Sequence, residues 1–450
     1  MSGHGHSHNG APCSGHGAPE GEGSSGFPAD MRDIIAQLTK AGIDVSQLPN
    51  LPSAPRNLED ARIKNYEFWS TQPVPAMTEN VPESVNEAIE PSIPEDKVRS
   101  EPFSLPDGFE WSDVDLQDKD QLHELYVLLA ENYVEDDDST FRFAYSEAFL
   151  KWALIVPGWR KEWHCGVRAK KTGRLLAFIS AVPQKIRVFD KKVEMVEINF
   201  LCAHKKLRAK RVAPVLIREI TRRVHKQGIF QAAFTAGIVI PKPVAVCRYY
   251  HRSLNPKKLV DIKFSHMAEN MTMARMIRIY KLPEKTATPG LRPMTKEDAP
   301  AVLKLLTKGM ENYSLAPIFS TTEEIEHLLL PKKDIVYSYV VQAKDGKITD
   351  MISFYSIPSS VIGHPAHKLL KAAYMYYYAV NSVPFKQLVN DALILAHQND
   401  FDVFNALDLM RNNEVFAELK FGIGDGNLQY YLYNWKCANM SPNQIGLVLL

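Results

Sequence analysis

An internal echo constrains the fold of this chain more than any other feature of its sequence. The segment FISAVPQKI at residues 178–186 resembles FYSIPSSVI at 354–362, and a glycine-containing turn of hairpin type precedes each of them. Further on, the apolar runs VEINFLCA (196–203) and AAYMYYYAV (372–380) each precede an amphipathic helix and another strand-like run. The offset stays near 175 residues. We therefore expect a pseudo-duplicated α/β architecture, with two mixed sheets in succession.

Length, charge and cysteine content narrow the class of protein. A chain of 450 residues exceeds the size at which one hydrophobic core keeps growing. A net charge of +1 argues against a field that covers the whole protein, so any site for an anion must be a local concentration of basic residues. The 5 cysteines are scattered and none forms a CxxC pair, which favours a reducing compartment over a disulfide framework or a zinc site. No apolar run approaches the roughly 18 residues that span a bilayer. We expect a cytoplasmic protein without an integral membrane segment.

Such a concentration of basic residues occurs within VEINFLCAHKKLRAKRVAPVLIREITRRVHKQG, residues 196–228. The apolar run ends near Ala203, a loop rich in lysine and arginine follows, and apolar residues then recur at helical spacing from Val212 until Gly228 provides a C-cap. A strand, a cationic loop and a helix N-terminus in this order suit a polyanion such as a pyrophosphate. The same residue types also occur in nuclear-localisation signals, in RNA-binding patches and on solvated faces. The spacing alone leaves these alternatives open.

The last residues of the chain, QIGLVLL (444–450), pose a separate question, because a terminus usually frays in water. Five of the last six side chains are apolar. This end of the chain is expected to pack inside the protein, and from the residues alone a docked terminal strand is the simplest interpretation.

Two long stretches, EINFLCAHKKLRAKRVAPVLI (197–217) and KFGIGDGNLQYYLYNW (420–435), resemble the signatures of the glycylpeptide N-tetradecanoyltransferase (N-myristoyltransferase) family. The resemblance covers the chain from about residue 56 to 450. It implies an α/β fold of two fused acetyltransferase-like (GNAT-type) halves with a pseudo-twofold relation around a continuous mixed sheet. The expected divisions are a disordered Gly/His-rich tail and lead-in (1–55), an acyl-CoA-binding half (56–272) and a peptide-binding half with a catalytic C-terminus (273–450).

The resemblance also implies an activity, the transfer of a myristoyl group from myristoyl-CoA to the amine of an N-terminal glycine. Myristoyl-CoA is then the acyl-donor substrate, and no metal or other prosthetic group is expected. In the family the general base is the C-terminal α-carboxylate, which here belongs to Leu450. The backbone N–H groups of Phe200 and Leu201 match the oxyanion hole, and Asn199 and Thr235 match positions that hold the peptide amine. A free α-carboxyl group titrates near 3.5, roughly, and an apolar surrounding raises the pKa of a carboxyl group.

The donor site implied by the resemblance combines the basic loop with a segment near the start of the globular part. The general acetyltransferase loop has the form Q/R-x-x-G-x-G/A, and Arg211 replaces its usual glycine here, as in myristoyltransferases. The family more often has glutamine where this chain has Glu67, which puts the contact of that residue with the donor in doubt. Cys202 lies in an apolar strand with no obvious histidine partner, so direct attack by the amine is preferred to an acyl-enzyme. The expected donor-binding residues are Glu67, Phe68, Trp69, Phe200, Leu201, Cys202, Ala203, Arg208, Ala209, Lys210, Arg211, Val212 and Ala213.

The resemblance assigns the peptide groove to residues from both halves. The acidic run YVEDDDSTFRF (133–143) would otherwise be taken as a solvated helix-capping turn, and GIGDG (422–426) has neither the spacing nor the following helix of a nucleotide loop. Gly237 is expected to leave room only for a glycine at the start of the peptide. The expected peptide-binding residues are Tyr133, Asp136, Asp138, Phe141, Phe143, Gly237, Tyr249, His251, Phe264, Tyr355, Ser359, Tyr374, Leu407 and Asp425.

Two other functions stay open on sequence grounds. One is an acetyl-CoA-dependent N-acetyltransferase, which a small acyl pocket would favour. The other is a non-catalytic ribosome or RNA adaptor that works through residues 204–226. The family often carries a lysine-rich N-terminal tract associated with ribosomes, and this chain has His and Gly there, so ribosome proximity is doubtful and nucleic acid is not an expected partner. The expected partners are proteins and peptides that begin with glycine, and the expected oligomeric state is a monomer.

Overall fold

The computed structural model describes residue 55, residues 58–134 and residues 140–450. It separates into two compact units, residues 1–65 and residues 66–450. The described part of the first unit contains helix α2 (Leu58–Ile63). All further description concerns the second unit. Among the described residues, none of the helices is both long enough and apolar enough to cross a bilayer.

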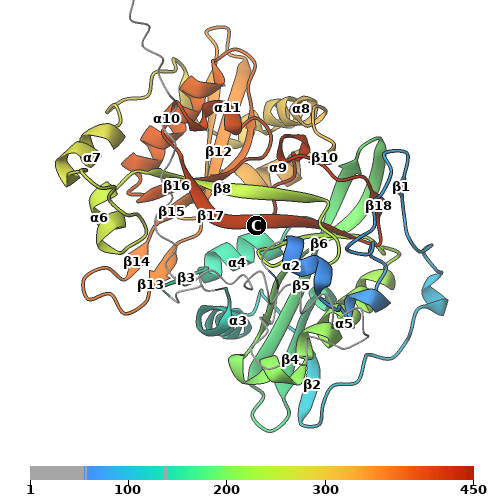
Figure 1. Ribbon diagram of the computed structural model, residues 1–450. Coiled ribbons are helices and arrows are strands. Elements are labelled where there is room, and N and C mark those ends of the chain that lie inside the picture. The colour runs from blue at the N-terminus through green and yellow to red at the C-terminus, as the bar shows by residue number, and fades with distance from the viewer. Residues whose placement is uncertain (1–54, 56–57, 135–139) are drawn as a thin grey trace, which may run out of the picture. The chain divides into compact units, whose positions relative to one another are not determined.

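A sheet of 13 strands organises the second unit, and its strands run in the order β2-β4-β5-β6-β7-β17-β8-β16-β15-β12-β11-β9, with β10 paired to β5 (Figure 1). Smaller sheets join β1 with β18 and β14 with β13 and β3. The strands are β1 (Asn86–Glu87), β2 (Phe109–Asp113), β3 (Phe141–Phe143), β4 (His164–Ala169), β5 (Leu175–Val188), β6 (Lys191–Ala203), β7 (Ala232–Ala236), β8 (Ala245–Ser253), β9 (Leu291–Pro293), β10 (Leu315–Pro317), β11 (Val336–Gln342), β12 (Ile348–Ser356), β13 (Ser359–Val361), β14 (Leu369–Leu370), β15 (Ala372–Ala379), β16 (Val403–Leu407), β17 (Gly422–Tyr433) and β18 (Lys436–Cys437).

The first half of the chain forms one edge of the sheet and the second half forms the other, and equivalent strands follow in the same order inward from each edge. β2, β4, β5, β6 and β7 of the first half then correspond to β9, β11, β12, β15 and β16 of the second. The two parallel pairs, β6 with β7 and β15 with β16, occupy corresponding places, and all other pairs are antiparallel. The echo in the sequence falls on corresponding strands, because its first members lie in β5 and β6, and its second members begin in β12 and lie in β15; the segment 354–362 then continues past the end of β12 into β13. The predicted fold class is confirmed.

The expectation of two sheets in succession is wrong in one respect, because the sheet is continuous. The last long strand of each half crosses to the other half: β17 pairs with β7, and β8 pairs with β16. β17 and β8 also pair with each other at the centre of the sheet. This exchange places both strands between neighbours from the other half, and the largest hydrophobic cluster contains residues of both halves.

Helices cover the sheet in the same order in both halves. α3 (Lys119–Asn132) and α4 (Glu147–Leu154) precede β4, as α8 (Ala299–Met310) and α9 (Thr322–Leu329) precede β11. α5 (Val212–His225) and α10 (Phe385–Gln398) form the crossover connections that join the two strands of each parallel pair. The other helices are α6 (Pro256–Asp261), α7 (Met273–Tyr280) and α11 (Asn413–Phe416), with short 3-10 turns η2 (Trp69–Thr71), η3 (Glu95–Lys97), η4 (Lys161–Trp163), η5 (Lys205–Lys210), η6 (Lys296–Asp298) and η7 (Pro442–Gln444).

Candidate active site

The C-terminal segment is buried, as its apolar composition predicts, and Figure 1 shows the C-terminus near the centre of the second unit. After η7 the side chains of Ile445, Leu447, Val448 and Leu449 are all buried. Hydrogen bonds to other parts of the chain hold the backbone, and four of them are these: Gly446 N–H donates to Leu315 (2.7 Å), Met410 N–H donates to Ile445 (3.1 Å), the Tyr430 hydroxyl donates to Leu447 (3.0 Å), and Val448 N–H donates to the Tyr377 hydroxyl (3.2 Å). The partners of these four bonds all lie in the second half of the chain, and strand β6 of the first half contacts the last residue, so both halves order the terminus.

The last residue meets strand β6. The side-chain amide of Asn199 donates a short hydrogen bond to the main-chain oxygen of Leu450. The N–H of Leu450 donates to Oε1 of Glu197 at 3.3 Å, and the same oxygen accepts from the Asn199 amide, also at 3.3 Å. The structure therefore brings together two residues that the sequence predicts for the site, Leu450 and Asn199, across a separation of 251 positions.

Strand β6 is bulged next to this contact. Phe178 pairs with Cys202 and Ser180 pairs with Asn199, so two residues, Phe200 and Leu201, stand opposite one. Phe200 has a φ of 53°, in the left-handed region that a bulky side chain rarely adopts. A bulge leaves its extra residue out of the strand ladder, and the predicted oxyanion-hole residues Phe200 and Leu201 lie at this bulge. In the structure the Phe200 N–H donates to Oδ1 of Asn199 at 2.8 Å.

Thr235 lies in the adjacent strand β7. The parallel pairing of β6 with β7 is confined to Val196 with Ala232 and Glu197 with Ala233. Thr235 and Asn199 lie two residues beyond the last of these pairs, at the same level of the two strands. Thr235 pairs on its other side with Tyr430, whose hydroxyl holds Leu447 of the terminal segment.

The predicted donor-binding residues gather at the start of α5. The basic loop forms the 3-10 turn η5, and α5 begins at Val212, as predicted. Its N-cap, Arg211, has a left-handed conformation (φ 52°) and provides no side-chain cap, so the first N–H groups of the helix have no side-chain acceptor from it. Arg211 and Lys210 are exposed, and Val212 is buried. The side chains of Arg208 and Ala209 lie outside the described set.

The segment at 67–69 packs against the same helix. Glu67 forms an exposed ion pair with Arg211 (3.1 Å), and the Arg218 guanidinium lies over the Phe68 ring at 5.6 Å. Trp69 stacks on Phe234 of β7 with ring centroids 6.2 Å apart. The three predicted residues of this segment therefore contact α5 or β7, next to the basic turn.

Cys202 and Ala203 complete the predicted donor side at the end of β6. Cys202 is 3% exposed, and its Sγ lies 4.0 Å from the carbonyl oxygen of Leu128 in α3. Ala203 pairs with Ala177 of β5. This placement makes Cys202 part of the core behind the bulge, which agrees with packing as its role.

Six of the predicted peptide-binding residues form a row of aromatic rings to which both halves of the chain contribute. Successive ring centroids lie 5.8 Å (Phe141 to Phe264), 5.3 Å (Phe264 to His251), 6.4 Å (His251 to Tyr249), 6.4 Å (Tyr249 to Tyr374) and 5.4 Å (Tyr374 to Tyr355) apart. Burial raises the pKa of Tyr374 to about 12 and that of the other two tyrosines still further, so all three phenols are neutral near pH 7.

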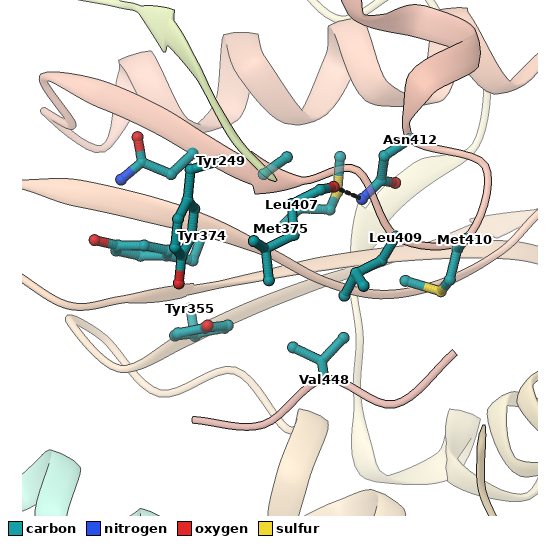
Figure 2. A pocket seen from close by; sticks show the side chains of 11 residues that line it. Tyr249, Tyr355, Tyr374, Met375, Leu407, Leu409, Met410, Asn412 and Val448 are labelled. Atoms are coloured by element: carbon teal, nitrogen blue, oxygen red, sulfur yellow. Dashed lines mark hydrogen bonds between the residues drawn. The ribbon is translucent and has the colours of Figure 1, made fainter. Parts of the chain in front are cut away.

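Three residues of this row, Tyr249, Tyr355 and Tyr374, line one narrow pocket together with Leu407, which was also predicted, as Figure 2 shows. Val448 of the terminal segment forms part of the same wall. The row therefore leads to the segment that carries Leu450. The sequence did not indicate the other lining residues, which are Met375, Asn405, Ala406, Leu409, Met410 and Asn412.

The remaining predicted residues border this row or the bulge. Tyr133 lies 5.9 Å from the Phe200 ring, and Phe143 lies 5.7 Å from Tyr145. Ser359 of β13 pairs with Phe143. Gly237 and Asp425 are exposed, in the loop after β7 and in the irregular start of β17. Asp136 and Asp138 lie outside the described residues.

Glu197 is the residue that sequence reasoning missed. It was passed over as part of an apolar run, although a glutamate two positions before Asn199 on a strand points to the same face. Burial raises the pKa of Glu197 to about 7, and the hydrogen bonds from Leu450 and Asn199 oppose this rise.

Comparison with known proteins identifies the family. Residues 88–247 match the family described as Myristoyl-CoA:protein N-myristoyltransferase, N-terminal domain, and residues 261–448 match its C-terminal domain. The chain belongs to the N-myristoyltransferase family. A Caenorhabditis elegans relative named probable glycylpeptide N-tetradecanoyltransferase is 66% identical over 447 residues, which cover 99% of both chains. Glycylpeptide N-tetradecanoyltransferase 2 of Danio rerio is 52% identical over 436 residues, or 95% of this chain and 88% of that relative.

Solved structures agree with this family assignment. The crystal structure of Saccharomyces cerevisiae N-myristoyltransferase with bound myristoyl-CoA has a TM-score of 0.83 to this chain at 42% sequence identity, and the match covers 86% of this chain and 100% of that one. The predicted family and the predicted class of enzyme, an acyltransferase, are confirmed.

Proposed function

We propose that this protein transfers a myristoyl group from myristoyl-CoA to the amine of an N-terminal glycine, by direct attack of the amine on the thioester. The name of the C. elegans relative and the myristoyl-CoA bound in the S. cerevisiae structure support this activity. The observation that carries the proposal is the contact of Leu450 with Asn199 beside the bulge of β6, because the basic turn follows the end of β6 and the aromatic row shares a pocket with Val448 of the terminal segment. A donor with a phosphorylated end and an acceptor peptide thus reach one place from two directions.

On the donor side, Lys210, Arg211 and the N-terminus of α5 bind the phosphates of CoA. Arg211 is held by Glu67 in the structure, and a phosphate oxygen replaces that carboxylate when the donor binds. A buried tetradecanoyl chain contributes on the order of 10 kcal/mol before the costs of ordering, at about 0.8 kcal/mol for each CH₂ group.

At the reaction centre, the N–H groups of Phe200 and Leu201 stabilise the oxyanion. Phe200 N–H now donates to Asn199 Oδ1, so the thioester oxygen takes the place of that oxygen when the donor binds. The Asn199 amide remains close to Leu450 through its nitrogen. Cys202 forms no acyl-enzyme, because its sulfur is buried behind the bulge.

The proton of the glycine ammonium goes to the terminal carboxylate of Leu450. The amine then forms the new N–C bond, the C–S bond breaks, and the thiolate of CoA takes the second proton. Peptide residues after the glycine lie along Tyr249, Tyr374 and Tyr355, and Gly237 borders the space for the glycine itself.

Intact mass spectrometry tests the reaction. The protein is incubated with myristoyl-CoA and a peptide of the type Gly-Asn-x-x-x-Ser with a free amino terminus. We expect the mass of one tetradecanoyl group to be added, and no addition when alanine replaces the first glycine. Myristoyl-CoA binding without transfer would contradict the proposal and would favour the acetyltransferase or the adaptor, which acetyl-CoA in the same assay distinguishes.

The terminal base has its own test. Removal of Leu450, or extension of the chain beyond it by one glycine, is expected to abolish transfer while myristoyl-CoA still binds. Full activity of the shortened protein would exclude the terminal carboxylate as the base.

A further inference from the structure

Glu197 belongs to one hydrogen-bonded group with the end of the chain. Its Oε1 atom accepts from the N–H of Leu450 and from the amide of Asn199, each at 3.3 Å. The same amide nitrogen donates to the main-chain oxygen of Leu450. The Asn199 amide therefore bridges two carboxyl groups, the side chain of Glu197 and the group that ends at Leu450.

Packing does not account for a glutamate at this place. Among the described residues, no basic side chain forms an ion pair with Glu197. The other titratable groups that face it are the phenols of Tyr355 from β12 and of Tyr376 and Tyr377 from β15. Burying a carboxylate without a cation is costly, and glutamine would accept the same two N–H groups without that cost. The charge therefore calls for another explanation.

We propose that Glu197 is a second carboxyl group of the deprotonation step, which positions Leu450 and, when ionised, raises the proton affinity of the terminal carboxylate. This inference rests on the proposed function, in which that carboxylate accepts the proton of the glycine ammonium. An isolated α-carboxylate is a weak base, because it titrates about four units below an α-amino group. A second negative charge held close by favours protonation of the first. Glu197 is a positioning residue in this scheme, since it acts on the base and not on the substrate.

The two carboxyl groups titrate as a coupled pair. Before the reaction both are ionised; the glycine ammonium transfers one proton to the Leu450 group, and the amine attacks the thioester. The proton leaves the pair to water after the amide has formed, which restores the starting state. When Glu197 is protonated, the terminal carboxylate loses its negative neighbour and becomes a weaker base.

The sign of the pH dependence follows from this scheme. Burial raises the pKa of Glu197 to about 7, so its negative charge is present above this pH and is lost as the pH falls through it. The chemical step is expected to slow over the same interval. Glu197→Gln carries no charge at any pH, so its rate lacks this dependence.

The test is single-turnover transfer, in which enzyme preloaded with myristoyl-CoA is mixed with excess glycine peptide between pH 5.5 and 9. Single turnover isolates chemistry from product release. The ratio of the wild-type rate to the Glu197→Gln rate cancels the titration of the peptide amine. We expect this ratio to rise from about 1 at pH 5.5 to about 10 at pH 8.5, with a midpoint near 7. Loss of the Glu197 charge is expected to lower the pKa of the terminal carboxylate by about two units. With a Brønsted coefficient of about one half, this fall slows proton transfer about tenfold.

Two further variants and one control make the result specific. Glu197→Asp retains the charge and is expected to keep the inflection with a smaller ratio. Glu197→Ala removes both charge and hydrogen bonds, and is expected to be slower than Glu197→Gln. Glu194→Gln on the same strand is the control, because Glu194 is exposed and pairs only loosely with Lys185 (3.9 Å), and it should behave as wild type. Myristoyl-CoA binding by calorimetry verifies that each variant is folded.

A ratio that stays the same at every pH would overturn the role of the charge, whether that ratio is 1 or 10. So would loss of the inflection in Glu197→Asp. Failure of the proposed function is recognised separately, because wild-type enzyme would then show no transfer at any pH.

Discussion

Replacement of Gly446 by alanine should displace the group that we propose as the base. A Cβ atom at this position would lie 2.6 Å from Cδ2, 2.9 Å from Cγ and 3.0 Å from Cβ of Tyr313. Ordinary carbon contacts are about 3.5–4.0 Å. Rotation of the tyrosine ring moves Cδ2 but leaves Cβ in place, and Tyr313 is only 8% exposed. The backbone of the terminal segment must therefore move.

The size of the effect follows from overpacking and from distance. Overpacking of a filled core costs about 1–3 kcal/mol, which changes the equilibrium between the docked and displaced terminus by about 5- to 150-fold. Gly446 is four residues before Leu450 and is held by one hydrogen bond to Leu315 (2.7 Å). A displacement of about 1 Å at a reacting group can slow a reaction about 100-fold. We expect Gly446→Ala to transfer 10- to 100-fold more slowly, roughly, in a single turnover.

The assay compares three quantities in Gly446→Ala and wild type: the single-turnover rate, the melting temperature and the affinity for myristoyl-CoA. The rate and the melting temperature should fall, and the affinity should not change, because Leu315, near Tyr313 in the chain, pairs with one end of β5 (Val188), whereas His204, before the basic turn, bonds to Leu176 at the other end. Gly309→Ala in α8 is the matched control, since nothing lies within 4 Å of its Cβ atom and alanine favours a helix. A wild-type rate in Gly446→Ala would refute the link between this segment and catalysis.

Three other predictions concern charged groups. Glu67→Gln should bind myristoyl-CoA about 2- to 5-fold more tightly and Arg211→Gln about tenfold more weakly, because Glu67 competes with phosphate for Arg211. Calorimetry measures both affinities, and a change of affinity in the same direction for both variants would contradict this competition. Folding raises the pKa of Glu197 from 4.5 to about 7, so the native state binds more protons than the unfolded state in that window and wild-type stability falls as the pH rises through it. In thermal melts, the free energy of unfolding of Glu197→Gln should therefore rise by about 3 kcal/mol relative to that of wild type between pH 4.5 and pH 8. A difference in stability between the two proteins that does not depend on pH would refute the raised pKa. Asp350 is buried, accepts hydrogen bonds from the N–H groups of residues 381–383, and has a lowered pKa, so its stabilisation is present above the unfolded pKa and is lost as the pH falls through the folded value. In urea titrations at pH 7, Asp350→Asn should lower the free energy of unfolding by about 2–4 kcal/mol. A smaller loss at pH 7 than at pH 3 would contradict this sign.

Local sequence patterns predicted the parts of the site that depend on neighbours in the chain. The helical spacing after the basic run placed the start of α5 at Val212, because periodic apolar residues act over a few turns. The predicted C-cap at Gly228 is wrong, since the helix ends at His225 and its C-cap is Lys226. The resemblance supplied most of the remaining site residues, and the structure brings Tyr249, Tyr355, Tyr374 and Leu407 together in one pocket. Glu197 was missed because a single glutamate in an apolar strand has no local signature of function.

The sequence by itself determined that the chain is duplicated, that a cationic turn precedes a helix, and that the C-terminus is too apolar to stay in water. Only the tertiary structure decided that β8 and β17 exchange between the halves, that β6 bulges at Phe200, and that Leu450 meets Asn199 and Glu197. Periodicity and composition report how each segment buries its own apolar face. Which segments share that burial depends on the free energy of the whole core, and the contacts between β6 and the terminus join residues more than 250 positions apart.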